Sequence, residues 1–326
     1  MKIVPIDPPA EEKKPEKDSK KIEDKKSPTK KTPTKKTPVA KTPTKKTPPK
    51  KTGKKDPPPK KQVKKDPPPK VVKSKTPRQP RLEDDEGFSG NRRPDVIPYR
   101  VGEEIVLGIS YFAVEAGKFT MQVRPMVEVN GKKSYHFRYL IKTSPLFNMV
   151  YRVDDVAETF VDYETLLPHS YEIHVNESKQ VRETRTFFDH RKQLATMWDN
   201  KQKKGKKLEK KKIQWELERW SQNVFSAAYY LRNFTLKVGK ELKVRVGHEG
   251  KNIVMTGKVL RKETLFTDAG KFETFVVQPQ FDVDGKFKPT GENYLWLTAD
   301  DRKFIVRLES KIKIGSIVGE VQKLKK

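Results

Sequence analysis

The chain has 326 residues, with 72 Lys or Arg, 43 Asp or Glu and no cysteine, so its formal net charge is +29. The absence of cysteine excludes disulfides, thiolate metal sites and cysteine nucleophiles. No run approaches the roughly 18 apolar residues of a transmembrane helix, and the first residues lack the apolar segment of a signal peptide.

A lysine–proline tract fills residues 27–75. It repeats a five-residue unit, SPTKK or TPTKK, and then a ten-residue unit that begins with DPPPK. Residues 21–80 hold 22 Lys or Arg against four Asp or Glu, a net charge of +18 (22 − 4). A segment with so little apolar surface to bury cannot offset its ordering entropy, so residues 1–95 are predicted to form a disordered arm. Proline and like charges favour extended chain, and the tract would then extend on the order of 150 Å.

The composition changes near residue 96, and residues 96–326 are predicted to form one β-rich domain. Apolar side chains alternate with period two over 105–111, 119–129 and 135–141, which is typical of strands. Asn130-Gly131 predicts a tight hairpin turn, because both central residues of a type I′ turn need positive φ. A further turn is predicted at 114–117 and one helical turn at 145–150. More strands are predicted at 151–161, 170–176, 182–188 and 193–198.

The second half of this domain contains a lysine run and the main predicted helix. Residues 201–218 are assigned to a basic insertion, because 201–212 is nearly all lysine and reads as an exposed loop or the frayed start of a helix. A helix is predicted over 221–233, capped by Ser221, because Val224, Ala227, Ala228 and Leu231 share one face. Strands are predicted again at 241–246, 252–262, 271–280, 292–298, 304–310 and 313–321.

Many regularly spaced strands with one helix predict a mostly β fold class. We expect a curved antiparallel sheet, or an open barrel-like domain, with one main helix. The turns are short, so neighbouring strands are expected to pair in sequence order.

No catalytic, cofactor or metal site is predicted. The Walker, GxGxxG and GxSxG motifs are absent. Adjacent acids such as Asp154-Asp155 point to opposite faces of a strand and do not form an acid/base pair. Metal-ligand spacing is missing among the five histidines, which are His136, His169, His174, His190 and His248.

We therefore expect a protein that is not an enzyme. The enzymatic alternative is a hydrolase of envelope sugars, which alanine substitution of Asp155, Asp189 and His190 would test.

Aromatic residues on the predicted helix and strands allow two interpretations. In the first, the helix packs against the end or the concave face of the curved sheet, and its tyrosines lie in the core and at the edge of the core. In the second, Phe225, Tyr229 and Trp296 line a cavity for an apolar ligand, which curved antiparallel sheets with one helix can hold.

The lysines of the arm and of the basic insertion are candidate polyanion-binding residues. The arm repeats resemble those of linker-histone tails, which neutralise phosphates with little sequence readout. No aromatic residues are interleaved, so base stacking is not expected. A charged spacer that touches anionic envelope polymers or lipid headgroups is the other interpretation. The candidates are Lys30, Lys31, Lys35, Lys36, Lys45, Lys46, Lys50, Lys51, Lys206 and Lys207.

Over about residues 99–322, several short stretches follow one another in the same order as in a known protein family. They are VNGK at 129–132, YRVDD at 151–155, TLLP at 165–168, FDH at 188–190, SAAYYLR at 226–232, DAGKFET at 268–274, LWLTADDR at 295–302 and IGS at 314–316. They resemble the domain-of-unknown-function 3108 family of bacterial exported proteins. The resemblance implies a β-rich fold, an export route and no established activity, and it carries over no catalytic residue. Members typically begin with a signal or lipoprotein sequence, which this chain does not show.

Two functional hypotheses follow. The first is a non-enzymatic protein of the bacterial cell envelope, in the periplasm or associated with the outer membrane. Its β-rich domain would bind an apolar or envelope-derived ligand or a protein partner, and its cationic arm would span the periplasm. The second is a nucleic-acid-associated protein with a histone-like basic tail.

Overall fold

A computed structural model describes residues 1–6, 93–94, 96–283, 286–288, 292–311 and 315–326. The predicted disorder of the arm falls on residues 7–92, which lie outside the described residues. Within the described chain, no helix is long and apolar enough to cross a bilayer.

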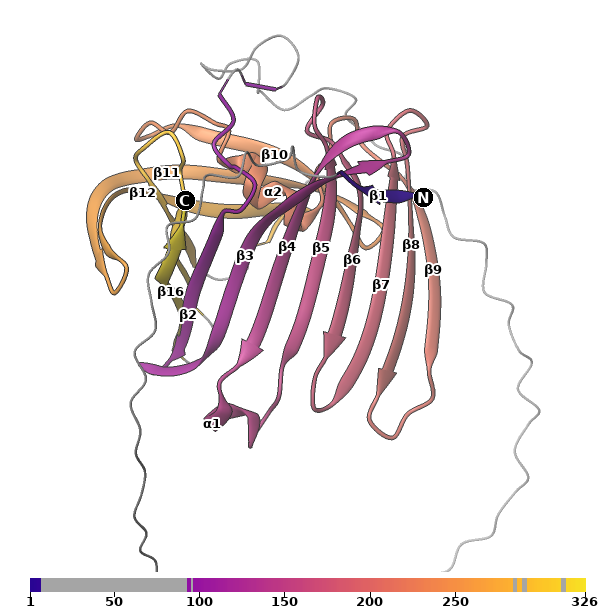
Figure 1. Ribbon diagram of the computed structural model, residues 1–326, viewed down its shortest axis with the longest axis horizontal. Helices are drawn as coiled ribbons and strands as arrows, with labels where there is room; N and C mark the ends of the chain where they lie inside the picture. Colours follow the sequence, from indigo (N-terminus) through magenta and orange to yellow (C-terminus); the bar gives the residue numbers. More distant parts are fainter. Residues whose placement is uncertain (7–92, 95, 284–285, 289–291, 312–314) are drawn as a thin grey trace, which may run out of the picture. The chain divides into compact units, whose positions relative to one another are not determined.

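One antiparallel sheet organises the domain and confirms the predicted fold class (Figure 1). Fourteen strands follow one another in a continuous hydrogen-bonded order from β10 to β9, and these two end strands do not pair with each other. Strand β1 (Ile3–Pro5) pairs with β3, and β13 (Lys286–Lys288) pairs with β12. The path runs β10 (Glu241–His248), β11 (Lys251–Thr267), β12 (Gly270–Val283), β14 (Asn293–Thr298), β15 (Ile305–Lys311), β16 (Ser316–Lys325), β2 (Glu104–Tyr111), β3 (Val114–Val129), β4 (Lys132–Thr143), β5 (Asp154–Asp162), β6 (Pro168–Asn176), β7 (Gln180–Asp189), β8 (Leu194–Lys203), β9 (Glu209–Glu216).

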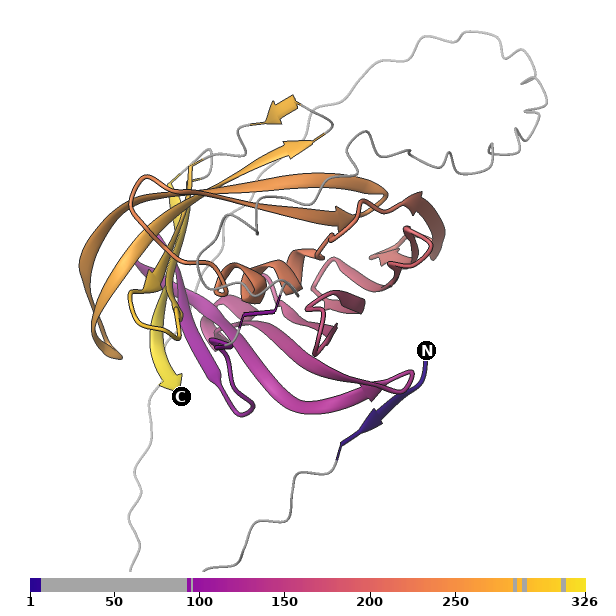
Figure 2. The ribbon, with the colours of Figure 1, turned by 90° about the horizontal axis from the view of Figure 1, so that it is seen from above.

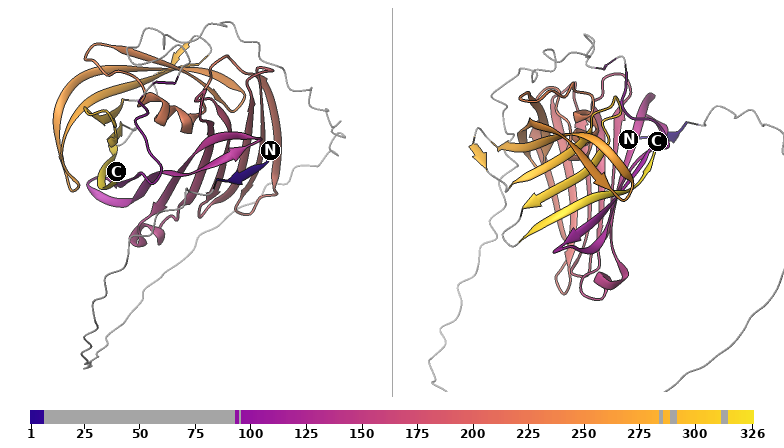
Figure 3. Two further views of the ribbon diagram at one scale, coloured as in Figure 1. Left: turned by 45° about the horizontal axis from the view of Figure 1, so that its top comes forward. Right: turned by 90° about the vertical axis from the view of Figure 1, so that its left-hand side faces the viewer.

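Short turns set this order. The β3–β4 hairpin turns at Asn130 and Gly131, whose φ angles of 50° and 81° confirm the predicted turn. The pairing of β16 with β2 brings the end of the chain beside the first strand of the domain. Figure 3 shows the yellow strands β15 and β16 running obliquely to the pink strands β5–β8, as expected for a strongly twisted and coiled sheet.

The main helix α2 (Val224–Leu231) lies against the concave face of the sheet, between β3–β5 and β10–β12 (Figure 2). Its N-cap is Asn223, and the Asn223 and Ser226 side chains form a capping box. The predicted cap, Ser221, instead donates from Oγ to the Glu218 carbonyl in the preceding turn. The short helix α1 (Pro145–Asn148) confirms the predicted helical turn and is capped by Ser144.

The core lies where α2 meets the sheet. The Tyr229 ring stacks on Phe137 with centroids 3.9 Å apart, and Tyr99 meets Tyr229 edge-on at 5.5 Å. At the end of α2, the buried Arg232 guanidinium holds the buried Glu103 carboxylate with two bonds of 2.6 and 3.0 Å. The helix is therefore fixed by aromatic packing along its length and by an ion pair at its C-terminus.

Three local predictions differ from the structure. The predicted basic insertion is an extension of the sheet, since residues 194–203 and 209–216 form the hairpin β8–β9. Three of the eight residues of β9 are lysines, but Ile213 and Trp215 pack inward against the buried cluster around Tyr171 and Phe188, which explains the strand. The turn predicted at 114–117 lies instead at Phe112. Residues 3–5, assigned to the arm, form β1.

Side chains connect the two end regions of the strand path, β7–β9 and β10–β11. The Asn252 side chain donates to the Glu216 carbonyl at 2.9 Å and accepts from the Glu218 N–H at 3.3 Å. Arg182 on β7 bonds Glu249, in the β10–β11 turn, at 2.7 Å. The strand path is therefore open, but these side chains connect its two end regions, and Gln222 adds an isolated parallel backbone bridge to Val246 of β10.

Candidate functional site

The aromatic residues predicted to line a cavity lie in packed surroundings. Tyr229 is fully buried in the ring stack under α2. The Phe225 ring meets Tyr139 at 5.3 Å, and the Tyr139 hydroxyl donates to the Phe225 carbonyl at 2.5 Å.

The third residue of that prediction, Trp296, lies on β14. Its ring nitrogen donates to Glu263 at 2.5 Å, and the Arg307 guanidinium lies 5.0 Å from its ring centroid. Three pockets of the described residues are lined by other side chains. In the structure, Phe225, Tyr229 and Trp296 thus contact other side chains of the domain.

An apolar surface continues from the core along the concave face of the sheet. Leu295, Leu308, Gly319 and Ile109 are directly paired across β14, β15, β16 and β2, and the three larger side chains are half-buried. They share the face of the buried Leu107 because side chains alternate along a strand. A Cβ on Gly319 would lie 2.8 Å from Ile109 Cδ1 and 2.9 Å from Leu308 Cγ. This row is called the inner apolar row.

Helix α1 lies at strand ends away from α2 (Figure 1), and exposed apolar side chains occur in and beside it. In α1 and the residues after it, Leu146 is 61% exposed, Met149 78% and Val150 84%. The neighbouring β2–β3 turn adds Phe112, which is 64% exposed, and the Ser144 N–H bonds the Ala116 carbonyl between the two turns. A soluble surface rarely carries so many apolar side chains together without a partner.

A second candidate site lies on the opposite face of the sheet. A bulge between Arg124 and Val127 turns the tip of the β3–β4 hairpin, so that Val127 and Val129 pack on Phe160 of β5. Asp162 and Phe187 also lie on this face, one residue away from the core residues Val161 and Phe188. The space between the hairpin tip, β1 and the β5–β6 and β7–β8 turns is the outer cleft, with a volume of about 710 Å³.

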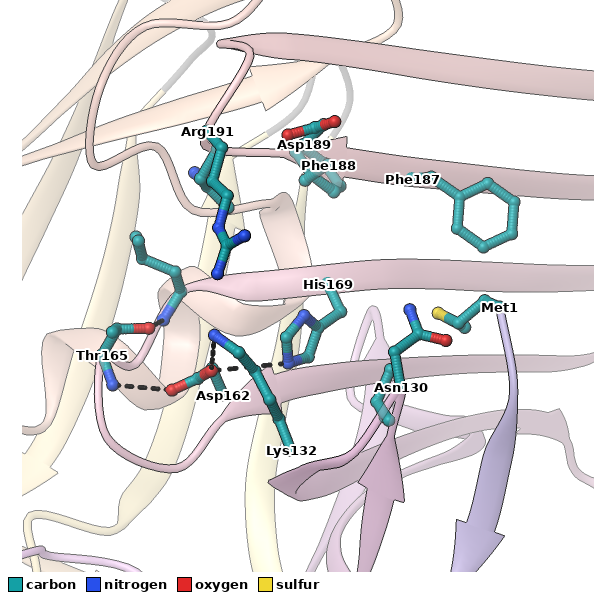
Figure 4. Close-up of a pocket in the computed structure, with 13 residues that line it drawn as sticks. Met1, Asn130, Lys132, Asp162, Thr165, His169, Phe187, Phe188, Asp189 and Arg191 are labelled. Carbon is teal, nitrogen blue, oxygen red and sulfur yellow. Dashed lines mark hydrogen bonds and ion pairs between the residues drawn. The ribbon is translucent and has the colours of Figure 1, made fainter.

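Charged side chains converge on this outer cleft (Figure 4). The buried Asp162 carboxylate accepts from the backbone N–H groups of Glu164 and Thr165 at 3.0 and 2.9 Å, and from Lys132 Nζ at 3.2 Å. His169 Nε2 lies 3.7 Å from the same carboxylate. The exposed Arg191 lines the cleft from the β7–β8 turn.

Burial and neighbours set the protonation of two of these groups. Burial alone would raise the pKa of Asp162, but the hydrogen bonds from Thr165 and Lys132 outweigh it and hold that pKa below its ordinary value. Burial lowers the pKa of His169, with a further decrease from Lys132 and only a partial offset from Asp162. Asp162 is therefore charged and His169 neutral near pH 7.

The residues of the hydrolase alternative do not form one constellation. Asp155 on β5 accepts from the Asn176 N–H at 2.9 Å, whereas Asp189 and His190 line the outer cleft. The Asp189 carboxylate accepts from the Lys192 N–H at 3.0 Å, and the His190 ring contacts the Pro168 carbonyl at 2.9 Å. No cluster of three or more metal-ligating side chains occurs among the described residues.

Sequence reasoning did not find Lys132, Asp162 and Arg191 as site residues. They come from three separate turns, and no spacing in the chain signals their meeting. Three of the stretches that carry the family resemblance, 129–132, 165–168 and 188–190, do line this cleft, and the first of them contains Lys132.

The predicted polyanion-binding lysines divide into two groups. Lys206 and Lys207 are exposed in the β8–β9 turn. The others, from Lys30 to Lys51, lie outside the described residues.

Comparisons with solved structures find distant similarity. A β-barrel-like protein of the DUF1849 domain of unknown function from Brucella abortus matches with 10% identity and a TM-score of 0.44, covering 69% of this chain and 97% of that one. A protein from Bacteroides fragilis described as exported, with a YmcC-like fold, has 11% identity and a TM-score of 0.32, covering 71% and 98%. A protein from Parabacteroides distasonis described as a lipoprotein has 12% identity and a TM-score of 0.32, covering 70% and 97%.

No protein with a curated description matches the chain. The family model for the protein of unknown function DUF3108 matches residues 108–322, which include every strand from β3 to β15, half of β2 and most of β16. This match confirms the resemblance seen in the sequence. The chain belongs to the DUF3108 family.

Proposed function

We propose that this protein is a non-enzymatic ligand-binding protein of the bacterial cell envelope, located in the periplasm or at the outer membrane. Its domain would hold an apolar, envelope-derived ligand against the concave face of the sheet. The cationic arm would contact anionic envelope polymers or lipid headgroups.

The inner apolar row carries this proposal. Its side chains are half-buried although they face the same side as the core, so they keep apolar surface available to a ligand. Further exposed apolar residues lie in and beside α1. Polar side chains would be expected there if the face only met water.

A matched pair of variants on β2 tests the ligand site. Ile109 faces inward in the row, and Val106 is equally half-buried on the other face of the same strand. Binding of the neutral fluorophore N-phenyl-1-naphthylamine is measured for the full chain and for Ile109→Asn and Val106→Asn. We expect the Ile109 variant to bind about five- to tenfold more weakly, because apolar contact is lost. The Val106 variant should bind normally.

Organic extraction of the purified chain followed by mass spectrometry supplies the second readout. Co-purified apolar molecules, reduced in the Ile109 variant, would support the proposal. Equal probe binding by both variants, together with an extract free of apolar molecules, would exclude the inner apolar row as a ligand site.

A further inference from the structure

We propose that the outer cleft binds a phosphate group carried by a small organic molecule, held by Arg191, Lys132 and His169. This site is on the opposite face from the inner apolar row and does not depend on it.

The three nitrogen-bearing side chains reach the cleft from separate elements. Lys132 begins β4, His169 lies near the start of β6, and Arg191 follows β7. Figure 4 shows the Arg191 guanidinium, the Lys132 ammonium and the His169 ring directed into the same space. Such convergence of donors is the usual arrangement around a bound oxyanion.

Each of these groups has donor capacity left for a ligand. Within the described chain, Arg191 has no carboxylate within 4.0 Å. Lys132 is 52% exposed and bonds Asp162 alone, so further N–H groups of its ammonium remain available. His169 Nε2 is buried without a hydrogen bond, since Asp162 at 3.7 Å is too distant for one.

The two acids of the cleft are satisfied by the protein itself. Asp162 accepts two backbone N–H groups as well as Lys132. Asp189 accepts the Lys192 N–H at 3.0 Å, and its other oxygen lies 3.7 Å from Lys192 Nζ. Among the described residues, no carboxylate forms an ion pair with Arg191, and a phosphate would favour the protonated form of His169.

The rest of the cleft suits an organic remainder. Its volume of about 710 Å³ exceeds what a lone phosphate fills, and lies in the range of small-molecule pockets. Val129, Leu167 and Phe187 supply apolar lining beside the charged groups.

The arm attracts any anion, so the test needs a readout at the cleft itself. In the full chain with labelled histidine, ring resonances are followed by NMR during titration with inorganic phosphate, glycerol 1-phosphate, or phosphatidylcholine vesicles containing phosphatidylglycerol. We expect the His169 resonance to shift saturably, while His136, His174 and His248 stay unmoved. A response to glycerol 1-phosphate identifies a soluble phosphate ester, and a response only to vesicles identifies a lipid headgroup.

Variants at exposed positions complete the test. Arg191→Gln and Lys132→Gln should each weaken the titration about tenfold or more, because a charge-assisted bond is lost. The neighbouring Lys192→Gln should leave it within about twofold. No saturable shift at His169, or a shift unchanged in both the Arg191 and the Lys132 variants, would overturn the proposal. Thermal melting of each variant verifies that it is folded.

Discussion

Replacing Arg232 by Met is expected to destabilise the domain strongly. Arg232 ends α2 and is fully buried together with Glu103, which it bonds at 2.6 and 3.0 Å. It also donates to the carbonyls of Pro98 at 3.2 Å and Arg302 at 2.9 Å. Met fills much of the same volume but leaves the Glu103 carboxylate with one cation, Arg302, at 2.8 Å. Removing one partner of a buried pair costs about 3–5 kcal/mol, and because Arg302 remains we expect about 3 kcal/mol.

Urea unfolding followed by tryptophan fluorescence measures this loss, and a melting curve should shift downward by about 6–12 °C. The control is Arg185→Met, which removes an exposed partner of Glu172 at 3.4 Å and should cost less than about 1 kcal/mol. Adding Glu103→Gln to Arg232→Met should recover part of the stability, since the uncompensated charge disappears. A loss below about 1 kcal/mol in Arg232→Met, or no recovery in the double variant, would refute the buried-charge reasoning.

Three further outcomes are expected. Tyr229→Phe should change stability by less than about 1 kcal/mol because the buried hydroxyl has no hydrogen-bond partner, whereas Tyr229→Ala should cost about 3–5 kcal/mol; melting curves of the two variants check this. The pKa of His169 and that of His248 are lowered, chiefly by burial, so the unfolded chain takes up protons first as pH falls below about 6.5 and stability decreases. His169→Gln should reduce that slope between pH 7 and 5.5 by up to about 1.4 kcal/mol per pH unit, and an unchanged slope would contradict the assignment. Deletion of residues 1–6 should speed hydrogen exchange at 127–129, where β1 pairs with β3, but should leave exchange in β7 unchanged.

Most of the strands are predictable from the sequence because one face of each is buried. Alternation identifies β2, β3 and β4, and Asn130-Gly131 gives their hairpin. The helix α2 is predictable because its apolar positions follow a 3.6-residue period. In these elements, local pattern and tertiary packing favour the same structure.

Other features depend on contacts that local sequence does not encode. The lysines of β9 hide its alternation, which only Ile213 and Trp215 reveal. Glu103, Arg232 and Arg302 form their buried network from three distant points of the chain. The outer cleft depends on a bulge that turns the β3–β4 tip across the sheet, so its residues meet only in three dimensions.

The pairing of β1 with β3 also changes how the cationic segment is connected to the domain. The chain leaves at Ile6, beside residues 126–129 of β3. It returns at Arg93, whose guanidinium lies 3.7 Å from the ring centroid of Tyr163, and the Tyr163 N–H bonds the Lys133 carbonyl in the same β3–β4 hairpin. Both attachment points thus lie beside the β3–β4 hairpin, so the described residues at the two ends of this segment are held close together on the same domain.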